Sequence, residues 1–361
     1  MTERCDCETA ERRLPGTYPD SLQKEGEPPT STPFSSVSAS EESSRKLQTD
    51  AAGKIADEKN TGTKRIGVIL PYPYSFVVQE RLRGILTALE ENNCELILYS
   101  VRDPDEYESL LDLIASDRRV DGLIVLSLLF PQAAALKFLA VGIPVCLVDS
   151  EVKGFCSICT DARAIGRSSA VSLFHRGYRK PAFIGEPTLF TSMVPMVEEL
   201  YRGFKNAWED MGVGLSPDFV WFGPYDPVEI ERAVLRFVSY GNLPDCILIP
   251  NDCMALVLIR VLEKKNLRVP GQIAVMSIGN SLVAQSFSLS SIDLRLANSG
   301  YLAVKAVLDC LSRSVKPSCC SQPFEIIERG TVAMKVGPSE KRAGWMNTPE
   351  TILRNCLDAQ S

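Results

Sequence analysis

Short apolar runs alternate with longer amphipathic stretches along the chain from residue 64 to about residue 329. The short runs predict buried strands, and stretches whose apolar positions repeat about every 3.6 residues predict helices that cover them. Strands are expected at 66–70, 96–100, 122–125, 145–149, 181–185, 219–222, 246–249, 273–277 and 325–329. Helices are expected at 78–92, 106–116, 131–140, 164–176, 197–211, 228–240, 252–269 and 297–312. This alternation is typical of a doubly wound parallel sheet.

The junction at Asn251 and Asp252 is the most informative point in this pattern. The apolar run Cys246–Ile249 ends just before it, and apolar residues at helical spacing follow from Met254 to Leu262. Ligands of open α/β sheets bind at the carboxyl ends of the parallel strands. Asn251 and Asp252 can therefore hydrogen-bond a ligand. The same residue types also cap helix N-termini, so both interpretations stay open.

Five further segments carry a family resemblance. They are 64–71 (KRIGVILP), 120–125 (VDGLIV), 142–149 (GIPVCLVD), 176–185 (RGYRKPAFIG) and 202–204 (RGF). Together with the segment 243–275, their order and spacing resemble the effector-binding half of the LacI/GalR bacterial regulators over about residues 63–334. That family shares its fold with sugar-binding periplasmic proteins.

The resemblance implies an α/β fold of two Rossmann-like lobes with parallel sheets, in the type I periplasmic-binding-protein-like arrangement. Three crossings between the lobes would place residues 63–160 and 291–313 in the first lobe, and 161–290 and 314–334 in the second. A small-molecule effector would bind in the cleft between the lobes and favour one arrangement of them. We expect a homodimer through the first-lobe face, as in the relatives, and no cofactor.

The candidate ligand-binding residues lie in loops at the carboxyl ends of the predicted strands. In the first lobe they are Tyr72, Tyr74, Ser75, Arg102, Ser127 and Asp149, and in the second lobe Asn251, Asp252 and Asn280. By resemblance, Asp149 and Asn251 match positions that often hydrogen-bond ligand hydroxyls. Each candidate also has a simpler interpretation as loop or capping chemistry.

Two departures from the family pattern bear on the ligand. Relatives place an arginine where this chain has Leu200, and Gly-aromatic-Asp where it has 277–280 (SIGN). A pocket without these groups loses charge-assisted hydrogen bonds to a sugar. Either the ligand is not a typical sugar, or the pocket is degraded. Tyr72, Tyr74 and Phe76 can offer stacking surface to a flatter ligand, such as a nucleoside.

The first 62 residues have a different composition from the rest of the chain. They contain six Leu, Ile, Val or Phe, and twelve Asp or Glu against eight Lys or Arg, a net charge of −4. This composition predicts disorder, with room for a short helix at 45–56. The acidic balance opposes phosphate binding, and no helix-turn-helix pattern is present. The chain as a whole carries −6 and has a pI near 5.2.

These observations leave two hypotheses about output. The chain is predicted to be a LacI/GalR-like transcriptional regulator, or a sensor derived from one, whose DNA-binding head is not recognisable. The alternative is a stand-alone solute-binding sensor that signals to a protein partner without binding DNA. DNA is thus a partner under the first hypothesis only, and the acidic N-terminal segment does not support DNA binding.

Membrane and export signals are not found in the sequence. No apolar run approaches the roughly 20 residues that span a bilayer. The N-terminus lacks the apolar core of a signal peptide, so we expect a cytoplasmic protein without membrane partners. In that compartment the twelve cysteines are interpreted as small, reduced residues, many of them in the core.

Metal and catalytic motifs are also incomplete. Cys156-x-x-Cys159 and the adjacent Cys319 and Cys320 do not complete a four-ligand zinc set, and the single histidine, His175, lies at no ligand spacing. No known catalytic constellation is recognised, so we expect neither a metal site nor an enzyme. Beyond the resemblance, residues 335–361 can form a short helix from Thr348, which packs on the body or binds a partner.

Overall fold

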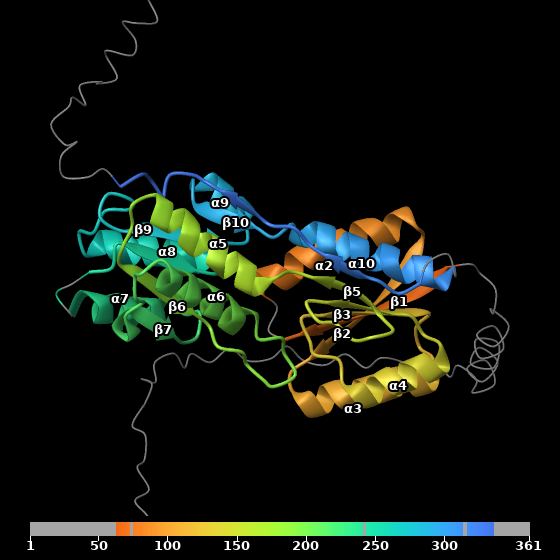
Figure 1. Ribbon diagram of the computed structural model, residues 1–361. Coiled ribbons are helices and arrows are strands. Elements are labelled where there is room, and N and C mark those ends of the chain that lie inside the picture. The colour runs from red at the N-terminus through yellow and green to blue at the C-terminus, as the bar shows by residue number, and fades with distance from the viewer. Residues whose placement is uncertain (1–62, 73–74, 240, 242, 313–315, 336–361) are drawn as a thin grey trace, which may run out of the picture. The chain divides into compact units, whose positions relative to one another are not determined.

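The computed structural model describes residues 63–72, 75–239, 241, 243–312 and 316–335. The strands of these residues form two six-stranded sheets, each covered by helices (Figure 1). The predicted α/β architecture is therefore confirmed. The helices expected at 45–56 and from Thr348 lie outside the described residues. None of the described helices is long and apolar enough to cross a membrane.

The first sheet is parallel throughout, with the strand order β11-β5-β4-β3-β1-β2. Its strands are β1 (Lys64–Pro71), β2 (Cys94–Val101), β3 (Gly122–Leu126), β4 (Val145–Val148), β5 (Cys156–Cys159) and β11 (Cys319–Ser321). Its helices are α2 (Phe76–Glu91), α3 (Pro104–Asp117), α4 (Gln132–Val141) and α10 (Leu296–Leu311). Helices α2 and α10 cover one face, and α3 and α4 cover the other, each pair over its own apolar cluster (Figure 1).

The second sheet has the order β12-β10-β9-β8-β6-β7, and only β12 runs antiparallel to its neighbour among the described strands. Its strands are β6 (Pro181–Gly185), β7 (Val220–Phe222), β8 (Cys246–Ile249), β9 (Ala274–Ile278), β10 (Ser290–Asp293) and β12 (Glu325–Ile327). Its helical elements are α5 (Ala162–His175), α6 (Met196–Asp210), the 3₁₀ turn η1 (Pro217–Phe219), α7 (Pro227–Ser239), α8 (Asp252–Lys264) and α9 (Leu282–Ser286).

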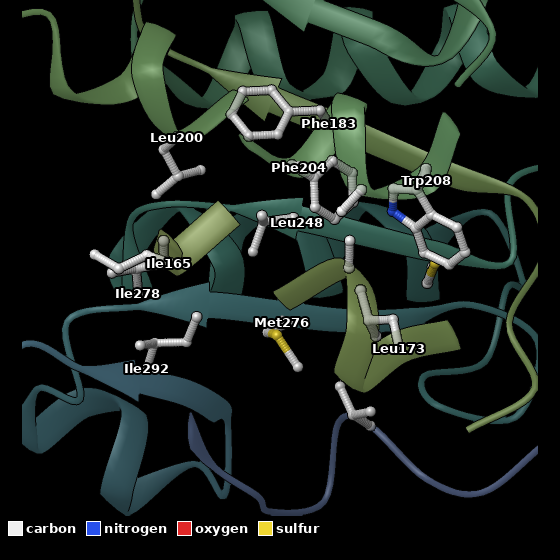
Figure 2. Packing of buried hydrophobic residues seen from close by; sticks show 14 of the residues in the cluster. Ile165, Leu173, Phe183, Leu200, Phe204, Trp208, Leu248, Met276, Ile278 and Ile292 are labelled. Atoms are coloured by element: carbon white, nitrogen blue, oxygen red, sulfur yellow. The ribbon is translucent and has the colours of Figure 1, made fainter. Parts of the chain in front are cut away.

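Each face of the second sheet carries a separate apolar core. Figure 2 shows the core beneath α5 and α6, where Phe204 and Trp208 pack towards Leu248 and Met276 of the sheet. The other core lies beneath α7 and α8. A sheet buried on both faces needs nearly continuous apolar strands, and the four residues of β8 are all buried.

The lobe boundaries differ from the predicted ones at two crossings. Strand β10 pairs with β9, so the first lobe resumes after residue 293 rather than at 291. Strand β11 pairs with β5, so residues 319–321 belong to the first lobe rather than the second. Both strands are short and largely without aliphatic residues (SSID and CCS), and the three residues of β11 are exposed. Such sequences lack the apolar pattern on which strand prediction depends.

Glycines allow one helix pair in each lobe to pack at very close range. A Cβ atom at Gly84 of α2 would overlap the carbonyl oxygen of Ala297, and one at Gly300 of α10 would overlap that of Arg81. The same arrangement recurs in the second lobe. There a Cβ at Gly203 of α6 would overlap the Arg163 carbonyl of α5. Close packing through glycine therefore recurs in both lobes.

The close packing at Gly203 predicts a large effect of a single methyl group. Gly203→Ala should lower the free energy of unfolding by about 3 kcal/mol, because backbone rather than a flexible side chain must move. Chemical denaturation monitored by circular dichroism measures this change. Gly214→Ala is the matched control, since a Cβ at Gly214 meets nothing within 4 Å. Equal stability of the two variants would contradict the close approach of α5 and α6.

Candidate functional site

A buried arginine organises the carboxyl ends of β3 and β4. The side chains of Arg81 and Asp149 are 1% and 2% exposed, and Arg81 Nη1 lies 2.6 Å from Asp149 Oδ2. Arg81 Nη2 donates a hydrogen bond to Asp149 Oδ1 at 2.8 Å. Ser127 Oγ accepts from Arg81 Nη1 at 2.7 Å and donates to Asp149 Oδ2 at 2.8 Å. Two predicted site residues, Ser127 and Asp149, are thus brought together, but by an internal cation.

Local backbone geometry holds this cluster in place. Ser127 and Asp149 follow their strands with positive φ angles of 53° and 69°, which turn both side chains back towards α2. Ser299 of α10 accepts a further hydrogen bond from Arg81 Nε at 3.4 Å. A buried carboxylate is tolerated when its charge is compensated and its oxygens are hydrogen-bonded, and both conditions are met here. Ligand contact by Asp149 therefore stays a prediction.

Arg81 is not among the site residues predicted from the sequence, although its place on α2 indicates that it is buried. It lies on the face of α2 that also buries Val78 and Ile85. A charged residue on the buried face of an amphipathic helix needs a buried partner. The sequence alone does not say which of the many carboxylates provides it.

Tyr72 and Arg102 form an exposed pair at the ends of β1 and β2. The Tyr72 side chain is 46% exposed, and the guanidinium carbon of Arg102 lies 5.3 Å from the centre of its ring. The Tyr72 amide donates to the Val101 carbonyl at 2.8 Å, which fixes its backbone to β2. Both side chains are therefore accessible to a ligand. Tyr74, the neighbouring candidate, lies outside the described residues.

Ser75 and Asn251 have capping roles. Ser75 Oγ accepts a hydrogen bond from the Val78 amide at 3.4 Å and begins α2. Asn251 Oδ1 accepts from the Met254 amide at 3.0 Å and begins α8. The capping interpretation of Asn251 is confirmed. The cap uses the side-chain oxygen and not the side-chain nitrogen, so the ligand interpretation stays a prediction.

Asp252 anchors a buried network in the second lobe. Its side chain accepts from the Ser291 hydroxyl at 2.8 Å and the Ser281 amide at 2.7 Å, and also from the Ser277 hydroxyl. The residue is 2% exposed. These donors join the start of α8 to β9, β10 and α9, which gives Asp252 a structural task at the carboxyl end of the sheet.

Asn280 lies beside this network and holds the loop after β9. It has a φ of 49°, and its side-chain nitrogen donates to Asp293 Oδ2 at 3.2 Å. Arg329 donates to its side-chain oxygen at 2.6 Å. Asn280 also lines a pocket of about 490 Å³ together with residues of α2, α9 and the start of α10. Of the predicted second-lobe residues, Asn280 is the one placed at this pocket.

Tyr225 is a further candidate that the sequence pattern did not single out. It follows β7, and its amide donates to Glu186 Oε1, just after β6, at 2.9 Å. Its hydroxyl is buried and has no hydrogen-bond partner among the described residues. Burial raises the pKa of this phenol above its ordinary value, so it remains a donor. A buried hydroxyl without a partner can be satisfied by a ligand or by water.

The loops at the carboxyl ends of the two sheets are in direct contact. The Leu129 amide donates to the Ser192 carbonyl at 2.8 Å, and the Val194 amide donates to the Ser127 carbonyl at 3.0 Å. From the first lobe, Phe76 packs against the core under α5 and α6. Leu200, at the place where relatives carry an arginine, is 5% exposed in that core. Leu200 therefore contributes to apolar packing at a position where the family pattern has a polar arginine.

Comparisons with known proteins agree with this architecture. Residues 170–332 match the family described as a periplasmic binding protein-like domain. The HTH-type transcriptional repressor PurR of Histophilus somni (strain 2336) is 24% identical over 261 residues, which cover 70% of this chain and 77% of the relative. The HTH-type transcriptional regulator CelR of Thermobifida fusca is 27% identical over 209 residues, 56% of this chain and 59% of that protein.

Solved structures of regulators share the fold. A LacI family transcriptional regulator from Bifidobacterium animalis subsp. lactis DSM 10140 superposes with a TM-score of 0.66 at 22% identity, covering 75% of this chain and 98% of that one. The complex of the transcriptional regulator CelR with cellobiose gives 0.64 at 20% identity, covering 82% and 92%.

The two sheets and their crossings therefore define a periplasmic-binding-protein-like domain. More narrowly, the chain is similar in sequence to transcriptional regulators such as PurR, and in fold to a LacI family transcriptional regulator. The named relatives are transcriptional regulators rather than enzymes. The described residues contain no group of three or more His, Cys, Asp or Glu placed to hold a metal ion.

The Arg81–Asp149 pair predicts strong energetic coupling. Arg81→Met should cost about 3–5 kcal/mol of unfolding free energy, because it leaves a buried carboxylate without its cation. The double variant Arg81→Met/Asp149→Leu should cost less than the sum of the single changes. Urea denaturation of all four proteins measures the coupling.

The neighbouring Arg83 provides the control for this cycle. Its side chain is 66% exposed and pairs with Glu80, so Arg83→Met should cost less than about 1 kcal/mol. Additive costs for the Arg81 and Asp149 variants, within about 0.5 kcal/mol, would show that the two side chains do not depend on each other.

Proposed function

We propose that the chain is a regulator-derived sensor that binds a small molecule between its two lobes. The observation that carries the proposal is the meeting of the two sheets at their carboxyl ends, where the loops after β3 and β6 hydrogen-bond to each other. Ligands of open α/β sheets bind at these strand ends. A ligand that contacts both lobes stabilises the arrangement in which they meet.

The available side chains favour a flat ligand over a typical sugar. Asp149 and Asp252, the two buried acids at the strand ends, already have internal donors. Tyr72, Arg102 and Tyr225 lie at the same strand ends and offer stacking surface, a cation and a phenol donor. Rings with polar edges use such groups well. We therefore favour a nucleoside-like or nucleobase-like ligand over an oligosaccharide such as the cellobiose bound by CelR.

Control of transcription is the proposed output. PurR and CelR, which the chain resembles over its two lobes, are regulators of the helix-turn-helix type. A stand-alone sensor that signals to a protein partner is the second candidate. The net charge of −4 in residues 1–62 favours it, because this charge opposes DNA phosphates.

A homodimer through the first-lobe face is part of the proposal. Leu86 of α2 and Leu98 of the edge strand β2 are 51% and 44% exposed. Apolar side chains at such positions gain free energy when a second copy covers them. The proposed dimer would bring the α2 faces of two first lobes together.

A thermal-shift screen of the full chain tests the ligand class. A nucleoside or nucleobase present at 100 times its Kd should raise the melting temperature by about 5 °C, since binding stabilises the folded state by about 2.7 kcal/mol. Arg102→Gln should remove most of the shift, and the exposed control Arg119→Gln, which lies outside the pocket, should preserve it. A larger shift with sugars would overturn the ligand class, and no shift with any compound would overturn the sensor.

A gel-shift experiment separates the two outputs. The full chain is mixed with the DNA upstream of its own gene, with and without the compound that gives the largest thermal shift. Transcriptional control predicts retarded DNA, a ligand-dependent change in its amount, and weaker binding at higher salt. Ligand binding without any retardation of the DNA would favour the stand-alone sensor.

A further inference from the structure

Cysteines that are separate in the sequence gather at one edge of the first sheet. Cys146 of β4 is paired in register with Cys156 of β5, and Cys319 and Cys320 of β11 pair with residues 157 and 158. Cys310 of α10 lies against the same edge, with its sulfur 3.5 Å from that of Cys156. The fold thus brings together thiols that form no recognisable motif in the sequence.

The two cysteines of the CxxC sequence cannot pair with each other within β5. Three residues of strand span about 10 Å, whereas disulfides join Cα atoms less than about 7 Å apart. Successive strand residues point to opposite faces, so Cys156 and Cys159 lie on different sides of the sheet. Cys156 packs in the core beneath α2 and α10, and Cys159 donates to the Ser150 carbonyl at 3.5 Å.

We propose that Cys156 and Cys310 are a disulfide-forming pair that links β5 to the last turns of α10. The sulfur atoms are already in contact and approach from different elements, so a modest side-chain rotation closes the bond. This disulfide would form whichever ligand the protein binds and whether or not it binds DNA.

The oxidant is a low-molecular-weight disulfide, RSSR. The Cys310 thiolate attacks one of its sulfur atoms, forming a mixed disulfide and releasing RS⁻. The Cys156 thiolate then attacks the Cys310 sulfur and displaces the second RS⁻. The two thiol protons go to the two released thiolates, so two protein thiols and one RSSR give one protein disulfide and two RSH.

Exposure decides which thiol reacts first. Cys310 is partly exposed on α10, whereas Cys156 is 5% exposed. Burial, and then the contact with Cys156, raise the pKa of Cys310 to about 12, and the nearby Asp309 adds to this effect. At neutral pH little thiolate is present, so the exchange is slow. The pair is therefore suited to sustained oxidation rather than to a rapid response.

The bond would fix the helix that follows the crossing from the second lobe back to the first. α10 begins shortly after β10 of the second sheet and is followed by β11 of the first. The two cysteines are 154 residues apart, so the disulfide closes a long loop in the unfolded chain. Long closed loops give large entropic stabilisation in the chain-entropy description. The oxidised protein should therefore be more stable and its first lobe more rigid.

Peptide mapping of the full chain tests the proposed bond. The reduced protein is incubated with oxidised glutathione, alkylated under denaturing conditions and digested with trypsin. The expected product joins peptide 154–163 to peptide 306–313. Cys156→Ser and Cys310→Ser should abolish it, whereas Cys159→Ser should preserve it. The melting temperature of the oxidised protein should rise by about 5–10 °C and return after reduction with dithiothreitol.

Four outcomes would overturn the proposal. The first is a link from peptide 154–163 to peptide 138–153, which contains Cys146, in place of the expected one. The second is a link to peptide 314–329, which contains Cys319 and Cys320. The third is the absence of any intramolecular link, while every thiol of the folded wild-type protein is recovered alkylated. Loss of the product in the Cys159→Ser protein would likewise exclude the Cys156–Cys310 pairing.

Discussion

The ion pair between Arg81 and Asp149 is the constraint on which the cleft end of the first lobe depends. It joins α2 to the ends of β3 and β4, and Ser299 ties it to α10. Because both charges are buried, neither side chain can be withdrawn without leaving the other uncompensated. The pair therefore fixes the loops that face the second lobe. It also uses a carboxylate that, by resemblance, would otherwise be a ligand contact.

The second lobe also has a buried acid at its strand ends, but among the described residues no arginine compensates it. Asp252 is buried at the strand ends and is satisfied by serine hydroxyls and a backbone amide. The two lobes thus share close glycine-mediated helix pairs and buried acids, but they compensate those acids differently. Both buried acids are compensated internally, so the proposed recognition of the ligand relies on groups such as Tyr72, Arg102 and Tyr225. This division between structural acids and the aromatic or cationic groups at the strand ends is the basis of the proposed preference for a flat ligand.

Much of the fold could be predicted from the sequence, because the parallel strands are continuous apolar runs and the helices are amphipathic. β5, β10 and β11 were not among the expected strands, because CSIC, SSID and CCS carry no continuous apolar run, and β11 pairs with β5, which is distant in the sequence. For the site, residue types correctly predicted that Asn251 could cap α8. The partner of Asp149 could not be predicted, because Arg81 is 68 residues away and only the fold brings the two together. The contact between Cys156 and Cys310 depends on tertiary structure in the same way.

Calorimetric titration tests the central claim most directly, using the compound that stabilises the full chain best. The claim is that Asp149 is an internal partner and that the exposed groups at the strand ends recognise the ligand. The Arg81→Met/Asp149→Leu double variant should then bind within about threefold of the wild-type Kd, whereas Arg102→Gln should bind at least about tenfold more weakly, a loss of about 1.4 kcal/mol. A folded double variant that no longer binds, beside an Arg102→Gln protein of unchanged affinity, would contradict the account.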